Sequence, residues 1–241
     1  MCYVFRIKNG NHKKGEGKDV IIGPNPGTQE SQMMVILLHG YGSWGENMAD
    51  LAYALDMPSV TFWCPDGPEV CDEYAPGRQW FSLRGVDWHV SDLHQAWQGI
   101  GGLLADAARK FHAQMQVRFP NYLGPVVVGG FSQGAMMAYE LGLFHPNFKG
   151  ILGFSGVYCV TKVLEYRPQV FWSHAQDDEV VPCSWMEQSH ELLAKNAISA
   201  HKYITPHGGH SISRDALMAS RTFLQKIGQG LAEFPGGKSP A

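Results

Sequence analysis

The sequence predicts a single α/β domain with a mostly parallel central sheet and helices on both of its faces. Short, uninterrupted apolar runs alternate with amphipathic segments, which is the pattern of buried parallel strands and the helices that cover them. A chain of 241 residues with 44% hydrophobic content can also bury one sizeable core. We therefore expect one domain at 21–232, preceded by a peripheral segment at 1–20 and followed by a tail at 233–241.

The apolar runs and the helical periodicity give the expected order of elements. Strands are predicted at 33–38, 60–64, 126–128, 150–156, 170–174 and 202–204, with a short strand at 1–7. Helices are predicted at 48–55, 90–119, 135–141, 183–197 and 214–231. The segment 69–86 shows no period and is predicted to be a long surface loop.

Composition excludes several classes of function. The formal net charge of -3 leaves no basic footprint for nucleic acid, and no run reaches the roughly 18 apolar residues of a membrane span, so we expect no stable membrane insertion. The five cysteines are odd in number and scattered, without the spacing of a zinc site or a disulfide framework. Reduced thiols in a cytoplasmic protein fit this pattern, and the sequence leaves a homodimer open.

The segment 126–135 has the features of a nucleophile elbow. Three valines favour a strand, a helical pattern follows at once, and between them Ser132 stands between Gly130 and Gly134. A sharp turn there would expose the serine hydroxyl and place the Gln133 N–H at a helix N-terminus, where it could bind an oxyanion. The alternative is a glycine-rich turn whose serine only caps the helix.

A second glycine-rich loop follows the predicted strand at 33–38. Its glycines allow the backbone to approach a ligand closely, and the N–H of Tyr41 is the best candidate for a second oxyanion donor. The alternative is a tight turn between a strand and a helix. The presence of an elbow elsewhere in the chain favours the oxyanion interpretation.

Acidic residues and histidines follow the last two predicted strands. The candidates are Asp177 and Asp178 after one strand, and His207 and His210 after the other. The order serine, acid, histidine is that of the α/β-hydrolases among catalytic triads. His89, Asp92 and His94 are also close in sequence, but their separations do not bring all three to one helical face, so we expect no metal site there.

Taken together, the chain resembles the phospholipase/carboxylesterase family of α/β-hydrolases, which includes acyl-protein thioesterases and bacterial carboxylesterases. The matching motifs are Leu-Leu-His-Gly-Tyr-Gly at 37–42, Arg-Gln-Trp-Phe-Ser-Leu at 78–83, Gly-Phe-Ser-Gln-Gly-Ala-Met at 130–136, Asp-Glu-Val-Val-Pro at 178–182 and Gly-Gly-His-Ser-Ile at 208–212. The Trp-Phe pair and the Gly-His-Ser-Ile ending make the bacterial branch the most similar.

The resemblance implies a role for each candidate of the triad. Ser132 becomes the nucleophile, His210 the general base and Asp178 the acid that orients it. It selects Asp178 by its distance from Val-Val-Pro and His210 by the Ser-Ile that follows. Ala175 departs from the glycine that the family usually carries there, and the family makes His39 a structural residue within its loop.

The resemblance also implies the activity: hydrolysis of carboxylic esters or thioesters through an acyl-enzyme, without a cofactor or a metal. Trp44, Trp80, Phe81 and Val181 are expected to line an apolar pocket for short to medium acyl chains, although Trp80 and Phe81 could instead anchor the core. A small or lipid-like ester is the expected partner. Lysophospholipase, acyl-protein thioesterase and a catalytically silent binding protein remain the alternatives.

Overall fold

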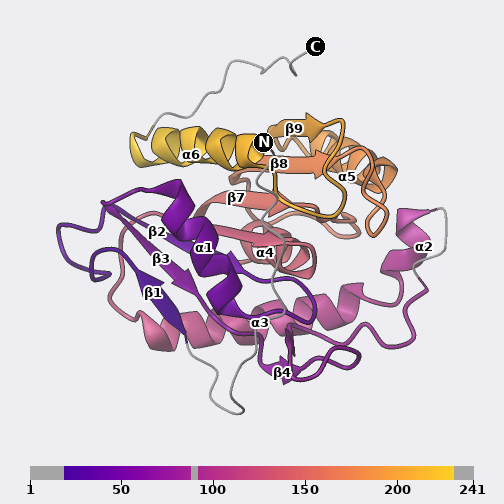
Figure 1. Ribbon diagram of the computed structural model, residues 1–241, viewed down its shortest axis with the longest axis horizontal. Coiled ribbons are helices and arrows are strands. Elements are labelled where there is room, and N and C mark those ends of the chain that lie inside the picture. The colour runs from indigo at the N-terminus through magenta and orange to yellow at the C-terminus, as the bar shows by residue number, and fades with distance from the viewer. Residues whose placement is uncertain (1–18, 88–91, 231–241) are drawn as a thin grey trace.

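The computed structural model describes residues 19–87 and 92–230, which fold around a seven-stranded sheet in the order β1-β3-β2-β6-β7-β8-β9 (Figure 1). The strands are β1 (Val20–Ile22), β2 (Met33–Leu38), β3 (Val60–Cys64), β6 (Val126–Phe131), β7 (Phe148–Phe154), β8 (Gln169–Ala175) and β9 (Ala200–Thr205). All neighbouring pairs are parallel except β1, which pairs antiparallel with β3 at the edge. The predicted fold class, an α/β-hydrolase fold with a mostly parallel sheet, is confirmed.

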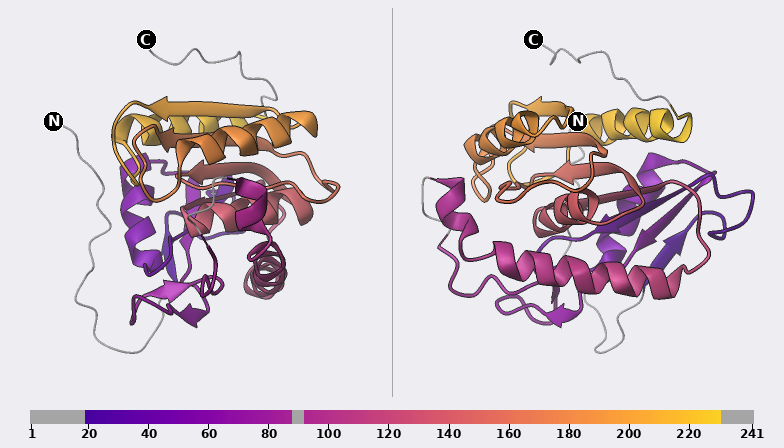
Figure 2. Two further views of the ribbon diagram at one scale, coloured as in Figure 1. Left: turned by 90° about the vertical axis from the view of Figure 1, so that its right-hand side faces the viewer. Right: turned by 180° about the vertical axis from the view of Figure 1, so that it is seen from behind.

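Helices cover both faces of the sheet (Figure 2). They are α1 (Gly45–Leu55), α2 (Leu93–Trp97), α3 (Gly101–Arg118), α4 (Gln133–Phe144), α5 (Cys183–Lys195) and α6 (Arg214–Gly228). The apolar side chains of α1 and α6 belong to one buried cluster, and those of α3, α4 and α5 to the other. Each face of the sheet therefore has its own core.

Strand β2 shows why the apolar runs are uninterrupted. Met34, Ile36 and Leu38 pack into the core under α3, α4 and α5, whereas the alternate residues Met33, Val35 and Leu37 pack into the core under α1 and α6. Every residue of the strand is buried. Because side chains alternate across a sheet, a strand covered on both faces needs apolar residues at every position.

Several predicted elements differ from the structure. The prediction of a single helix at 90–119 is wrong, because α2 and α3 are separate helices. Glycines at 99, 101 and 102 lower the helix propensity where α2 ends and α3 begins. The side chain of Asp92 accepts a hydrogen bond from the His94 N–H and caps α2, as expected of a helix start. His89 lies outside the described residues.

The segment 69–86 is less irregular than predicted, because β4 (Glu69–Val70) pairs antiparallel with β5 (Arg78–Gln79). The sequence does not predict β1, and the strand expected at 1–7 lies outside the described residues, as does the tail. The strands at 33–38 and 60–64 are confirmed to the residue. Within the described ranges, no helix is long and apolar enough to cross a membrane.

Candidate active site

Ser132 stands alone between β6 and α4 in a strained backbone conformation. Its φ is 53° and its ψ is -116°, although residues other than glycine rarely adopt a positive φ. Such a conformation costs about 1–3 kcal/mol and persists only where the surrounding structure imposes it. The sharp strand-to-helix turn that the sequence predicts is therefore present.

Two glycines make this turn sterically feasible. A Cβ atom at Gly130 would lie 2.3 Å from the carbonyl carbon of Gly134, and a Cβ atom at Gly134 would lie 2.1 Å from the carbonyl oxygen of Leu38. Real Cβ atoms do not approach backbone so closely. Close packing between β2, β6 and α4 therefore requires glycine at both positions.

The loop after β2 lies directly against the serine. A Cβ atom at Gly40 would be 3.5 Å from the Ser132 Cβ and 3.1 Å from the Phe131 ring. The next residues are anchored to the strand β5, since the Gly42 N–H donates to the Arg78 carbonyl and the Arg78 N–H donates to the Ser43 carbonyl, both at 2.9 Å. Tyr41 is therefore held between Gly40, which packs on Ser132, and Gly42, which is hydrogen-bonded to β5.

His39 is completely buried and holds two loops together. Its Nδ1–H donates to the Gly40 carbonyl at 2.7 Å, and its Nε2 accepts from the Gly67 N–H at 2.8 Å. Burial lowers the pKa of His39 to about 4. The structural role expected for this residue is confirmed by these contacts.

The Gln133 side chain connects the elbow to the segment after β5. Its Oε1 accepts from the Trp80 N–H at 3.0 Å, and its Nε2 donates to the Phe81 carbonyl at 2.7 Å. The Trp80 indole N–H in turn donates to the His39 carbonyl at 2.8 Å. The backbone N–H of Gln133 begins α4 and has no acceptor within the helix. These bonds hold three loops in one arrangement around Ser132.

The acid candidates behave differently. Asp178 is buried, and its Oδ2 lies 2.9 Å from the His210 Nδ1, while its Oδ1 accepts from the Val180 and Val181 N–H groups at 2.9 Å each. The His210 ring packs on the Phe131 ring with centroids 4.8 Å apart. Phe131 is the residue directly before Ser132. The ends of β6, β8 and β9 thereby bring these residues together.

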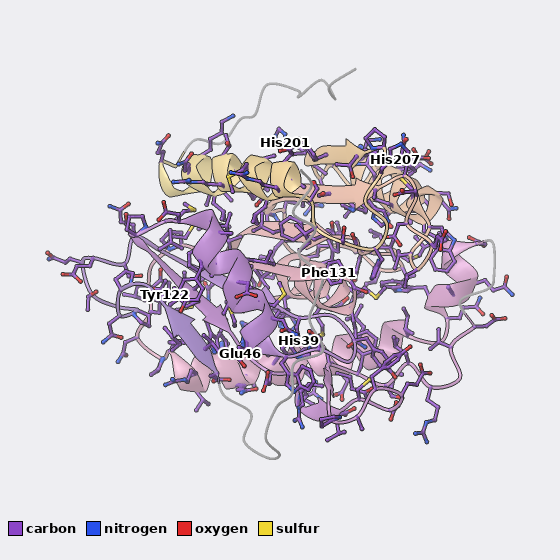
Figure 3. All side chains as sticks on the ribbon, in the orientation of Figure 1. His39, Glu46, Tyr122, Phe131, His201 and His207 are labelled. Atoms are coloured by element: carbon purple, nitrogen blue, oxygen red, sulfur yellow. The ribbon has the colours of Figure 1, made fainter. Side chains whose placement is uncertain are left out.

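The rival pair lies on the surface. Asp177 accepts from the Gly209 N–H at 2.8 Å and lies 3.4 Å from the Nδ1 of His207. The His207 side chain is 90% exposed, and Figure 3 shows it at the edge of the molecule near β9, whereas Phe131 and His39 lie near the middle. The Asp177–His207 pair can brace the histidine loop, but it faces solvent.

Hydrogen bonding controls the charge of Asp178. Burial of the carboxylate raises its pKa, but contacts with His174, His210 and the Val181 N–H outweigh that effect and hold the pKa well below the usual range. His174 is the one neighbour that the sequence does not single out. The only sequence signal for this contact is that His174 precedes Asp178 by four residues. The signal is weak because β8 ends between the two residues.

The predicted pocket residues occupy two environments. Trp80, Phe81 and Val181 are buried within the core under α3, α4 and α5, and the Trp80 ring packs against Phe111 with centroids 5.4 Å apart. Trp44 is only half-buried and precedes α1. The contacts of Trp80 favour the anchoring alternative for its indole.

Other hollows lie away from Ser132. A cavity of about 580 Å³ is lined by residues at the starts of β2, β6 and β7, including Met34, Val126 and Lys149. Because these strands are parallel, this cavity is at the opposite edge of the sheet from Ser132. In the ranges 19–87 and 92–230, no group of three or more His, Cys, Asp or Glu residues could hold a metal ion.

A strained serine on a strand-to-helix turn, a buried carboxylate–imidazole pair and a seven-stranded sheet define a hydrolase of the α/β-hydrolase class. The chain belongs to the Phospholipase/Carboxylesterase family, whose model matches residues 21–228. The family named by the sequence resemblance is thereby confirmed. Together with the relatives, this membership identifies an esterase-type hydrolase.

The relatives carry thioesterase and esterase names. Acyl-protein thioesterase 1 of Gibberella zeae is 26% identical over 83% of this chain and 93% of its own length. A probable carboxylesterase of Oryza sativa subsp. japonica is 24% identical over 81% of this chain and 77% of its own. The crystal structure of esterase PE8 superposes with a TM-score of 0.76 at 29% identity, covering 88% of this chain and all of that one.

Proposed function

We propose that the chain hydrolyses carboxylic esters or thioesters with Ser132 as nucleophile, His210 as general base and Asp178 as the acid that orients it. The carrying observation is the 2.9 Å contact between Asp178 Oδ2 and His210 Nδ1, beside the strained elbow. A serine hydroxyl is a weak nucleophile, and an imidazole fixed by a carboxylate is what activates it. The surface pair of Asp177 and His207 offers no such buried partner.

The reaction proceeds in two steps. The Ser132 Oγ attacks the carbonyl carbon while His210 Nε2 takes its proton, and collapse of the tetrahedral intermediate expels the alcohol or thiol, which receives that proton. Water then attacks the acyl-serine, giving its proton to His210. The acid is released and the serine regains its proton.

The backbone N–H groups of Tyr41 and Gln133 are the proposed oxyanion donors. Gly40 packs against Ser132, so the Tyr41 N–H follows directly on that contact, and the Gln133 N–H begins α4. Donors of this kind stabilise the developing charge without reorganising, and the loss of one typically costs about 3 kcal/mol of transition-state stabilisation.

The proposed substrate has an apolar acyl chain of short to medium length, in a small or lipid-like ester. Two exposed side chains near the site support an apolar rim: Tyr74, which packs on Tyr41, and Val180, whose N–H donates to Asp178. An acyl-protein thioesterase activity is the second candidate, favoured by the name of the Gibberella zeae relative. Lysophospholipase activity uses the same carbonyl chemistry.

Labelling with a fluorophosphonate tests the assignment of the nucleophile. We expect the parent protein to be labelled at Ser132 and to hydrolyse p-nitrophenyl esters, and Ser132→Ala to be folded, unlabelled and inactive. Hydrolysis by Ser132→Ala at the parent rate would refute the serine assignment. An unlabelled, inactive parent would instead favour a silent binding protein.

A matched series of acyl esters and acyl thioesters with increasing chain length then defines the substrate class. We expect kcat/KM to peak at short or medium chains and to be lower for a charged acyl group. A thioester preference at equal chain length would favour the thioesterase candidate, since the acyl group is then constant and only the leaving group differs.

A cytoplasmic location is also part of the proposal. Cys64, Cys71, Cys159 and Cys183 are free thiols, and the first three are buried. Free thiols are typical of a reducing compartment. Fractionation of the native host, with detection of the chain in the soluble reduced pool, is the test.

A further inference from the structure

His174 lies against the carboxylate of the proposed acid. It is the next-to-last residue of β8 and is completely buried. Its Nε2 is 2.8 Å from the Val181 carbonyl oxygen and 3.3 Å from Asp178 Oδ2, the same oxygen that contacts His210. Asp178 Oδ2 thus contacts two histidines, and only His210 has a solvent-accessible side chain.

The hydrogen-bond pattern defines the tautomer of His174. A carbonyl oxygen only accepts, so the proton must be on Nε2, where it faces both the Val181 carbonyl and the carboxylate. Among the described residues Nδ1 has no hydrogen-bond partner, so a second proton there would be buried without an acceptor. His174 is therefore a fixed donor that cannot replace His210 as base.

This donor closes a compact loop at the end of β8. Val181 donates its N–H to Asp178 Oδ1 and accepts from His174 through its carbonyl, so both ends of the turn are held. With the Val180 N–H and His210, the carboxylate has neighbouring donors on both oxygens. Contacts on both oxygens restrict rotation of the carboxylate and hold Oδ2 against His210.

We propose that His174 is a positioning residue for the reaction, acting through Asp178 and the Val181 turn to aim the acid at His210. The inference rests on the proposed function, because it takes Asp178 and His210 in their proposed roles. It adds a fourth side chain to the three that the sequence motifs select.

The proposal predicts an effect on pH dependence that a purely structural role would not have. The titratable groups facing the Asp178 carboxylate are His174 on β8, His210 after β9 and Cys183 at the start of α5. Loss of the His174 donor leaves the carboxylate a stronger acceptor for the charged imidazole of His210. The acidic limb of the kcat/KM profile should then move to higher pH.

The test compares His174→Leu, which removes the donor, with His174→Gln, whose amide N–H can take the place of Nε2–H. We expect His174→Leu to lower kcat/KM by about 10- to 100-fold, because a misplacement of about 1 Å can lower a rate by that much, and to shift the acidic limb upward. His174→Gln should stay within about 5-fold of the parent without that shift. His190→Gln is the matched control, because the Nδ1 of His190 on α5 is also buried without a partner among the described residues.

Parent-like kcat/KM and pH profile in folded His174→Leu would overturn the proposal, as would equal losses in both variants with no movement of the limb. If His174→Leu does not fold, His174→Asn replaces it, because its shorter side chain cannot reach Val181 and Asp178 together. Labelling of the parent at Ser132 separates the two levels: an unlabelled parent overturns the proposed function, whereas a labelled parent with insensitive His174 variants overturns only the positioning role.

Discussion

The Nδ1 atom of His210 lies 2.9 Å from Oδ2 of Asp178, across loops that follow β8 and β9. Because the two strands are parallel neighbours, residues 32 positions apart in sequence meet at one edge of the sheet. The contact fixes the ring so that Nε2, the other nitrogen, is free for a serine proton. This geometry gives the first prediction.

Asp178→Asn should lower kcat by about 10,000-fold, because an amide in place of the carboxylate favours the wrong imidazole tautomer and removes the charge. The measurement is steady-state hydrolysis of a p-nitrophenyl ester with the variant shown to be folded by circular dichroism. Asp177→Asn is the matched control, since it makes the same change one residue earlier on an exposed carboxylate. Similar losses in the two variants would contradict the assignment of Asp178.

The elbow glycines give a stability prediction. Gly134→Ala places a methyl group 2.1 Å from the Leu38 carbonyl oxygen, so we expect it to lower the free energy of unfolding by about 3 kcal/mol or more. Gly102→Ala on α3 meets no atom within 4 Å and should raise it by about 0.5 kcal/mol. Urea unfolding of both variants measures the difference, and equal midpoints would contradict the packing argument.

Burial of His39 predicts that stability falls with acid. Its pKa is lowered to about 4 in the folded state against 6.5 for an unperturbed histidine, so the unfolded chain binds a proton that the folded state refuses between these values. Stability from this residue is therefore intact above pH 6.5 and declines as pH falls to about 4. The loss amounts to about 3 kcal/mol over that window.

Chemical unfolding at several pH values tests this through a comparison of slopes. His39→Asn cannot titrate, so the difference in free energy of unfolding between parent and variant should shrink as pH falls from 6.5 to 4. Gly102→Ala changes no titratable group and meets no atom within 4 Å, so it should keep the slope of the parent. A constant difference between parent and His39→Asn would contradict the burial argument.

The lowered pKa of Asp178 also makes the folded state less stable in acid, but at lower pH than His39 does. A carboxyl group whose folded pKa lies below its unfolded value of about 3.9 stabilises the protein above that pH, and the contribution is lost as pH falls further. The stability difference between the parent and Asp178→Asn should therefore shrink below about pH 4. Persistence of the full difference at pH 2.5 would contradict it.

The sheet was predictable because β2, β3 and β6 are buried on both faces and therefore read as continuous apolar runs. The elbow was predictable because a sharp strand-to-helix turn has no room for a Cβ atom at Gly130 or Gly134, so the glycines mark it in the sequence. The roles of Asp177 and Asp178 differ only in where adjacent side chains point, which spacing alone does not encode. The family motif separated them, and in the structure Asp178 contacts His210 whereas Asp177 contacts the exposed His207.

Features that depend on distant packing were not predictable. His174 lies near the end of β8, and its contact with Asp178 exists only because the chain turns after that strand. Whether Trp80 lines a pocket or anchors the core depends on Phe111, which arrives from α3. Neither contact follows from a repeating pattern in the sequence, although His174 and Asp178 are only four residues apart.

The Gln133 carboxamide gives the last prediction, because its N–H donates to the Phe81 carbonyl at 2.7 Å while its oxygen accepts from Trp80. In Gln133→Glu an ionised carboxylate would face that carbonyl and push apart the loops around Ser132. Misplacing the Gln133 backbone N–H should cost about 10- to 100-fold in kcat, less than removing a donor outright.

Protonation of the new side chain restores an O–H donor, and burial raises the pKa of a glutamate held in such a site. The ratio of variant to parent kcat should therefore rise as pH falls from 8 to 5.5, which rate measurements on one ester at matched pH values can establish. Taking the ratio cancels any pH dependence that both proteins share. A ratio that stays constant across this range would show that the carboxamide contacts do not hold the oxyanion donor in place.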